Sequence, residues 1–430
     1  MKKQFMAGLI AVAASLPAQA ETRDFFVQFA NSGEDWSTTG TQGENGWHYG
    51  FFDNTSNPNV FVQFDQATHW NTNRWDHGFN GGVNATNDPW TEITQTGGHP
   101  NTSNTNLISN PGVNPKGPEF WAVRRYTVPA GISGQIGADW HVFKNNTNGT
   151  GVTGALLHNG TIIDSAAIAG NANTRSSGGS GLTTFPVTPG DTVEFALTPE
   201  GAGGAAGDGS DSSTFGMNLG FVTTVQNAAL IADSIADWST NGTQGENGWT
   251  YGYYDVTASP NHATGDLIEF DPGTHWTGSA WDLGGGAPWT NVGESAAHPN
   301  GINNAAEHWV TRRYEVGAGE TGDLYVDFSF NATNLNGTGV SLNILHNGTL
   351  VSTTTIAGND GDGVTRTAFI PGAQLGDSID ISLTPVGLNG DPADGSDGSA
   401  FSAKIYLAPE PGTMALLSLT GLALIFRRRR

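Results

Sequence analysis

The chain has 430 residues, of which 61 are glycine and 13 are tryptophan, with 40 acidic residues against 17 basic ones and no cysteine. The lack of cysteine excludes disulfide bonds. The formal net charge of −23 argues against a nucleic-acid partner, because phosphates need a basic face. Many glycines and asparagines with scattered aromatics favour short strands joined by turns over long helices.

The first twenty residues have the pattern of a secretory signal peptide. Lys2 and Lys3 precede an apolar run, and Ala18-Gln19-Ala20 supplies a small-x-small cleavage site. We therefore expect residues 1–20 to be removed during export.

A stretch of nineteen residues occurs twice with few changes, at 35–53 (DWSTTGTQGENGWHYGFFD) and at 237–255 (DWSTNGTQGENGWTYGYYD). Shorter landmarks recur in the same order: Thr68-His69-Trp70 and Thr274-His275-Trp276, His99-Pro100-Asn101 and His298-Pro299-Asn300, Arg124-Arg125-Tyr126 and Arg312-Arg313-Tyr314. A period of about two hundred residues is too long for a solenoid repeat and fits two whole domains in tandem. We predict repeat 1 at residues 21–224 and repeat 2 at residues 225–407.

The first half of each repeat is rich in turn residues. Thr22–Ala30 of repeat 1 contains FFVQFA and predicts a strand. Residues 54–118, mostly Asn, Thr, Gly and Pro, predict long loops with one or two strands. A loop region of this length is uncommon in a compact domain unless it is functional.

The second half of each repeat has clearer strands. Residues 121–128 and 136–142 alternate apolar and polar side chains, and Asn159-Gly160 between two apolar runs predicts a type I′ hairpin. Repeat 2 has the same pattern, with its hairpin at Asn347-Gly348, and residues 226–236 are expected to form its first strand. The sequence thus predicts an all-β protein of two tandem antiparallel β-sandwiches of jelly-roll type.

Each repeat also carries one ordered set of motifs: ENGWxYG, His-Pro, an Arg pair before an aromatic residue, an Asn-Gly hairpin, GDxVxF or a close variant, and an Asp-Ser-rich loop before the last strand. This set resembles a β-sandwich domain of many PEP-CTERM and planctomycete surface proteins. The chain departs from that pattern at Tyr126 and Tyr314, where the family more often has tryptophan. The resemblance implies a fold and export, and it carries no activity.

The C-terminal segment 408–430 combines Pro409-Glu410-Pro411, an apolar run at 412–426 and four arginines. The run is shorter than the roughly 20 residues of a full membrane span. The three parts resemble the PEP-CTERM sorting signal, which an exosortase cuts in Gram-negative bacteria; a plain C-terminal anchor is the alternative. The resemblance implies export, transient inner-membrane anchoring through this short hydrophobic helix, and release to the cell surface or extracellular matrix, where such proteins accompany exopolysaccharide.

Tryptophans and histidines of the loop-rich halves are candidate ligand-binding residues. The set is Trp70, Trp75, Trp90 and His99 in repeat 1, with Trp276, Trp281, Trp289 and His298 in repeat 2. Sugar rings stack their apolar faces on indoles, while nearby amides and carboxylates bind the hydroxyls. The alternative is that these indoles form the core of domains poor in leucine and isoleucine.

Two acidic loops are candidate metal sites. Each has the sequence DGSD and places two carboxylates three residues apart, Asp208 with Asp211 and Asp394 with Asp397. Calcium binds oxygen ligands in such flexible loops, although the EF-hand spacing is absent. Solvated turns are the alternative. One arginine of each Arg pair should face inward and bind an aspartate, for example in the DGSD loop.

No spacing in the chain matches a catalytic motif such as HExxH or a nucleophile elbow. We expect a non-enzymatic protein that binds or co-assembles with exopolysaccharide in the biofilm matrix. A self-associating structural protein is one alternative, and a polysaccharide lyase or glycosidase is another.

Overall fold

The computed structural model describes residues 21–409, except 59, 78, 81–82, 85–89, 103–117, 175–176, 208, 261 and 389. The predicted signal peptide, Asp208, Glu410, Pro411 and the rest of the C-terminal segment lie outside the described residues. The described part is all-β, and its strands pair antiparallel except where Val27 of β1 and Thr367 of β26 form a parallel bridge between the repeats. Its helices are single turns such as α1 (Gln66–His69). No described helix has the length and apolar character that a membrane span requires.

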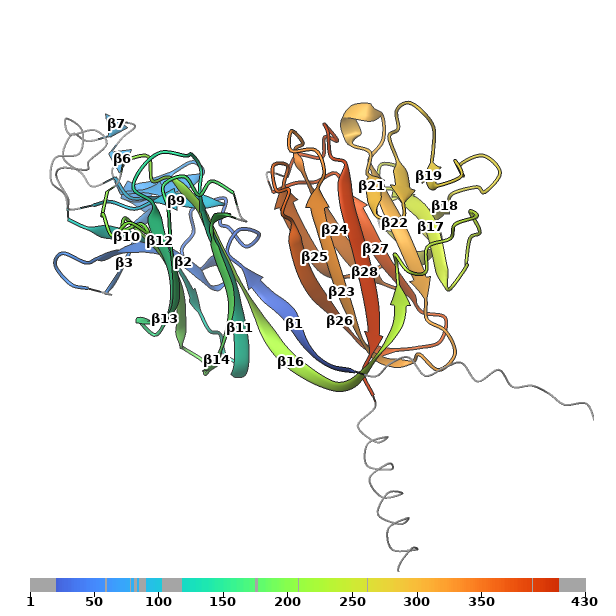
Figure 1. Ribbon diagram of the computed structural model, residues 1–430, viewed down its shortest axis with the longest axis horizontal. Helices are drawn as coiled ribbons and strands as arrows, with labels where there is room; N and C mark the ends of the chain where they lie inside the picture. The colour runs from blue at the N-terminus through green and yellow to red at the C-terminus, as the bar shows by residue number, and fades with distance from the viewer. Residues whose placement is uncertain are drawn as a thin grey trace, which may run out of the picture.

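Repeat 1 is a sandwich of two large sheets, the first of which continues into repeat 2 as one 14-stranded sheet (Figure 1). Within the described residues, β6 (Phe79–Asn80) and β7 (Val83–Asn84) form a separate two-stranded sheet. The first sheet contains β14 (Gly179–Val187), β11 (Gly134–Lys144), β16 (Ser213–Asp233), β1 (Glu21–Asn31), β9 (Gly97–His99), β8 (Glu92–Thr94), β5 (Arg74–Asp76) and β4 (Trp70–Asn71). The second has the order β13 (Thr161–Ile168), β12 (Val152–His158), β15 (Thr192–Thr198), β10 (Phe120–Thr127), β2 (Trp47–Asp53), β3 (Phe61–Gln63).

Repeat 2 has the same arrangement (Figure 1). One sheet has the order β19 (Ala280–Asp282), β20 (Asn291–Gly293), β21 (Ala296–His298), β28 (Ser399–Leu407), β23 (Gly322–Ala332), β26 (Val364–Ala373). The other has the order β18 (Ile268–Glu269), β17 (Trp249–Asp255), β22 (His308–Glu315), β27 (Ser378–Thr384), β24 (Gly339–His346), β25 (Thr349–Ala357). The predicted duplication is therefore a duplication of strand order.

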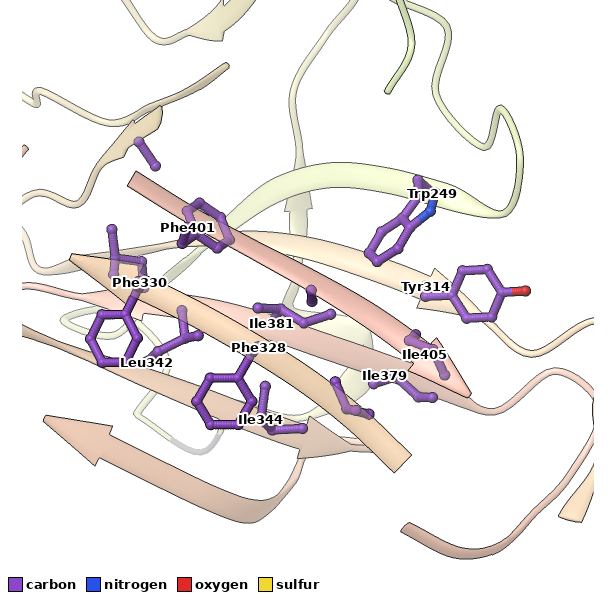
Figure 2. Close-up of a cluster of buried hydrophobic side chains, with 14 of the residues drawn as sticks. Trp249, Tyr314, Phe328, Phe330, Leu342, Ile344, Ile379, Ile381, Phe401 and Ile405 are labelled. Atoms are coloured by element: carbon purple, nitrogen blue, oxygen red, sulfur yellow. The ribbon is translucent and has the colours of Figure 1, made fainter. Parts of the chain in front are cut away.

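Alternating apolar residues build the core between the two sheets of each repeat. In repeat 2, Phe328 and Phe330 of β23 face Leu342 and Ile344 of β24 across the sandwich, as Figure 2 shows. Every second residue of a strand points to the same face, so each strand contributes one apolar row. Burial of one side chain of this size contributes about 1.5–3 kcal/mol to the stability of the folded state, so these rows hold the two sheets together.

The two Asn-Gly hairpins are confirmed. Asn159 and Gly160 have φ of 50° and 76° between β12 and β13, and Asn347 and Gly348 have φ of 51° and 76° between β24 and β25. Two successive positive φ values define the type I′ turn that the sequence predicts. The loop-rich segment 54–118 holds more strands than expected, because the seven short strands β3 to β9 lie within it.

The long strand β16 runs from one repeat into the other. Its first part pairs with β11 and β1, while residues 229–233 pair with 404–407 of β28 as the first strand of repeat 2. Between the repeats, Phe25 stacks on Tyr325 at 4.2 Å, and Arg23 donates to Asp327 at 2.7 Å. The repeats are therefore joined by a continuous strand with its own small apolar cluster.

Candidate functional site

Trp75 and Trp281 belong to the core, which corrects their prediction as ligand contacts. Each indole has 0% exposure. Trp281 packs between Tyr251 and Phe270, with ring centroids 5.9 and 6.2 Å away. A ring without exposed surface cannot stack on a sugar.

Trp70 and Trp276 are half-buried, because each indole covers a glycine in the recurring nineteen-residue stretch. Gly40 and Gly242 have φ of 71° and 74°. A Cβ built on either would lie 2.3 and 2.5 Å from the indole of Trp70 and Trp276 respectively. Only glycine allows both this backbone conformation and this approach. These two indoles therefore pack between the recurring stretch and the core tryptophans Trp75 and Trp281.

Trp90 and Trp289 are the exposed members of the predicted set, at 37% and 44% exposure. The backbone N–H of each donates to a buried asparagine side chain, Asn101 Oδ1 at 3.1 Å and Asn300 Oδ1 at 2.8 Å. The indole of Trp90 also stacks on the ring of His99, with centroids 4.2 Å apart and planes 10° apart. Both positions thus present an indole from a fixed backbone.

His99 and His298 support these positions. His99 is buried at 1% exposure, which corrects its prediction as a ligand contact, and its Nδ1 lies 2.7 Å from the Pro100 carbonyl oxygen. His298 is half-buried, with its Nδ1 2.6 Å from the Pro299 carbonyl oxygen. Each histidine shapes the loop that carries the asparagine beneath the exposed indole.

The described carboxylates of the DGSD loops are buried. Asp211 has 0% exposure and binds the ammonium group of Lys144, the Thr150 hydroxyl at 3.2 Å and the Gly151 N–H at 3.3 Å. Asp394 and Asp397 have 3% and 2% exposure. Within the described residues, no group of three or more histidines, cysteines and acids is arranged to hold a metal ion.

The inward arginines do not pair with aspartate, contrary to the sequence prediction. Arg312 is fully buried and donates to the carbonyl oxygens of Ser234, Gly293 and Glu294 at 3.2, 2.8 and 2.7 Å. Arg124 binds the carbonyls of Ser32, Thr94 and Gly97 in the same way. Burial lowers the pKa of both guanidinium groups to about 10, so they stay charged at neutral pH.

The second arginine of each pair binds a buried carboxylate on the neighbouring strand. Arg125 contacts Glu194 at 2.9 Å, and Arg313 contacts Asp380 at 2.6 Å. These pairs link β10 to β15 and β22 to β27 within their sheets. Both arginine pairs therefore stabilise the sandwiches.

A cleft of about 590 Å³ between the repeats was not predicted. Its lining combines amides and hydroxyls with apolar side chains, and it includes Asn31, Thr96, Phe143 and Asn145 from repeat 1 and Thr355 and Asn359 from repeat 2. Arg366 donates to Gln28 and to Asp139, at 2.9 Å each, across the two repeats. No local pattern in the sequence could reveal this cleft, because it depends on how the two repeats lie against each other.

Glu34 makes a further contact between the repeats. One of its carboxylate oxygens accepts from the Thr355 N–H at 2.7 Å, and the other accepts from Gln28 at 3.3 Å. Burial at this contact raises the pKa of Glu34 to about 7. Its charge therefore changes near neutral pH.

No protein-family model matches the chain. No curated protein matches it either. Among solved structures, it is similar to a catalytic domain with two CBM51 domains from Clostridium perfringens, at 11% identity and a TM-score of 0.19, covering 67% of this chain and 34% of that one. It is also similar to tandem CBM51 modules of a family 98 glycoside hydrolase from Streptococcus pneumoniae, at 10% identity and a TM-score of 0.19, covering 69% and 86%. The ANX2 ectodomain from Arabidopsis thaliana is similar at 12% identity and a TM-score of 0.22, covering 68% and 84%. With TM-scores this low, the fold rests on the strand pairing described above.

Proposed function

We propose that this chain is an exported protein that binds a neutral extracellular polysaccharide through Trp90 and Trp289. One observation carries the proposal: each repeat buries its other loop tryptophans wholly or in part and leaves an indole exposed at the same place. Trp90 and Trp289 are 37% and 44% exposed, so part of each large apolar ring contacts water and does not contribute to the stability of the fold through burial. A ligand with apolar faces, such as a sugar ring, would remove this apolar surface from water when it binds.

Two equivalent indoles on one chain suit a polymeric ligand. A polysaccharide presents the same sugar face many times, so binding at one repeat raises the effective concentration at the other. Without the two end segments, the chain keeps 11 basic and 39 acidic residues, a net charge of −28. This charge repels anionic polymers and favours neutral ones.

Export and sorting are part of the same proposal. The signal-peptide pattern at 1–20 and the Pro409-Glu410-Pro411 segment with its arginine tail support inner-membrane passage, exosortase processing and release to the surface or matrix of a Gram-negative bacterium. A jelly-roll topology, supported by the strand spacing, and a relation to the PEP-CTERM surface domain, supported by the motif order, are part of the same proposal.

Affinity electrophoresis tests the binding proposal. We expect hydroxyethylcellulose or another neutral glucan or mannan to retard the chain, and alginate to leave it unretarded. Trp90→Ala and Trp289→Ala should each weaken binding by about 10-fold or more through lost avidity, and the double variant should not bind. Leu375→Ala is the matched control, because Leu375 is also exposed (65%) but lies in the turn between β26 and β27. Equal retardation of all variants would refute the indole sites, and loss of binding in Phe143→Ala alone would assign the ligand to the cleft.

Self-association is the second candidate, and a separate observation favours it. The edge strands β13 and β25 expose Ile162 and Ile163, and Leu350 and Val351, at equivalent positions. An exposed apolar edge strand is a template for pairing with another chain. Sedimentation velocity at rising concentration tests this: a monomer at every concentration excludes it, and oligomers that disappear in Ile162→Lys with Leu350→Lys support it.

A further inference from the structure

The described parts of the two DGSD loops share their strand pairing and differ at a buried position beside it. Lys144 at the end of β11 pairs with Ser213, two residues after Asp211, and Ala332 at the end of β23 pairs with Ser399, two residues after Asp397. The register therefore makes Ala332 the counterpart of Lys144. Repeat 1 has a buried cation at this point, and repeat 2 has a methyl group.

In repeat 1 the loop encloses the lysine ammonium group. Lys144 has 0% exposure, and its Nζ donates to Asp211 Oδ1 and, at 2.5 Å, to the carbonyl oxygen of Ser210. A Cβ built on Gly149 would lie 2.4 Å from Asp211 Oδ1 and 3.0 Å from Lys144 Nζ. Oxygens of this loop thus bind a positive charge in the absence of solvent.

The same oxygens are present in repeat 2. Asp397 Oδ1 accepts from the Gly339 N–H at 3.1 Å and Oδ2 accepts from the Thr338 hydroxyl at 2.9 Å, as Asp211 does with Gly151 and Thr150. A Cβ built on Gly337 would lie 2.4 Å from Asp397 Oδ1 and 2.9 Å from the Ser396 carbonyl oxygen. Both loops also place their serine at positive φ, 62° for Ser210 and 66° for Ser396. The loop conformation is therefore similar in the two repeats, with two differences: Asp397 Oδ1 also accepts from the Thr338 N–H at 2.9 Å, and the carbonyl nearest the glycine is that of Gly209 in repeat 1 and that of Ser396 in repeat 2.

The positive charge is missing from the described part of repeat 2. There, no lysine or arginine forms an ion pair with Asp394 or Asp397. Asp394 has 3% exposure, and its Oδ2 has no hydrogen-bond partner, while its Oδ1 accepts from Asn304 at 2.6 Å. The half-buried His298 ring lies beside the loop, near Gly398. A buried carboxylate oxygen without a partner is costly, so a bound cation would stabilise it.

We propose that repeat 2 binds one Ca²⁺ where repeat 1 encloses the Lys144 ammonium group. The ligands would come from the Asp397 carboxylate, the Ser396 carbonyl and the unpartnered Asp394 carboxylate. All are hard oxygen donors, and two negative charges match a divalent ion. Of the two DGSD loops that the sequence predicts as calcium sites, we thus propose only the loop of repeat 2, because the Lys144 ammonium group already supplies the positive charge in repeat 1.

Isothermal titration of the full secreted chain with CaCl₂, after treatment with EDTA and desalting, tests the proposal. We expect one Ca²⁺ per chain and a rise in the unfolding temperature of one of two calorimetric transitions. Ala332→Lys should abolish Ca²⁺ binding, because it installs the ammonium group of repeat 1. Asn331→Lys is the matched control: it adds the same charge one residue away on the alternate face of β23 and should leave Ca²⁺ binding unchanged.

A second variant guards against misfolding. If Ala332→Lys does not fold, Asp394→Asn removes one ligand charge, and we expect Ca²⁺ binding at least tenfold weaker. Three results would each overturn the proposal. They are no Ca²⁺ binding by the wild-type chain, binding of two Ca²⁺ per chain, and unchanged Ca²⁺ binding in a folded Ala332→Lys or Asp394→Asn variant.

Discussion

Replacing Arg312 by methionine removes a cation that ties three segments of repeat 2 together. The guanidinium group lies at 0% exposure and donates to the Ser234 carbonyl and hydroxyl and to the carbonyls of Gly293 and Glu294. It also stacks on Phe401, with its Cζ 4.2 Å from the ring centroid. Methionine retains much of the side chain's length and loses every donor.

The size of the stability loss follows from the number of backbone carbonyls that lose their hydrogen-bond donor. Each buried acceptor that loses its partner costs about 1–3 kcal/mol, and three carbonyls are affected. Some would find water or a second donor, so we expect a loss of about 3–6 kcal/mol in the free energy of unfolding of repeat 2. This is a large part of the roughly 5–15 kcal/mol by which a domain is stable.

Urea denaturation and calorimetry, with the transitions of the two repeats resolved, measure the effect. Lys404→Met is the control, because Lys404 is half-exposed and its 3.4 Å ion pair with Asp233 should contribute less than about 1 kcal/mol. A loss below about 1 kcal/mol in Arg312→Met would refute the reasoning, since the carbonyls would then not depend on the arginine.

Three further predictions follow. The pKa of Glu34 is raised from 4.5 to about 7, so its contribution to stability is complete below about pH 4.5 and is lost as the pH rises through 7; Glu34→Gln should flatten the dependence of the unfolding temperature on pH in this range. Trp281→Ala should destabilise repeat 2 by about 3–5 kcal/mol in calorimetry, because the indole is buried at 0% exposure; near-neutral behaviour would contradict its place in the core. Protein recovered from the medium of the producing cell should begin at Glu21 and lack the arginine tail by intact mass spectrometry, and a chain that retains residues 412–430 would contradict the sorting proposal.

The fold was the predictable part of this molecule. Period-two alternation and the Asn-Gly hairpins are local patterns, and each determines a local structure that is kept in the sandwich. The internal duplication then predicts the same structure for both halves of the chain. The sequence does not predict the individual short strands β3, β4, β5, β8 and β9, because two or three residues are too few to show alternation.

The candidate site was predictable only in outline. Composition indicates tryptophans in loops, but it does not separate the exposed Trp289 from the buried Trp281. Trp281 lies on β19 and Trp289 in the segment between β19 and β20, and the burial of each depends on tertiary packing. The Arg312 prediction failed for a related reason: an inward cation needs acceptors, and backbone carbonyls carry no signal in the sequence.

The most direct test of the account is oxidative footprinting of the tryptophans, read by mass spectrometry, with and without the neutral polysaccharide that retards the chain. In the free protein we expect oxidation at Trp90 and Trp289 and none at Trp75 and Trp281. Bound polysaccharide should protect Trp90 and Trp289 together. Unchanged oxidation of both indoles in a chain that holds the polysaccharide would contradict the central claim.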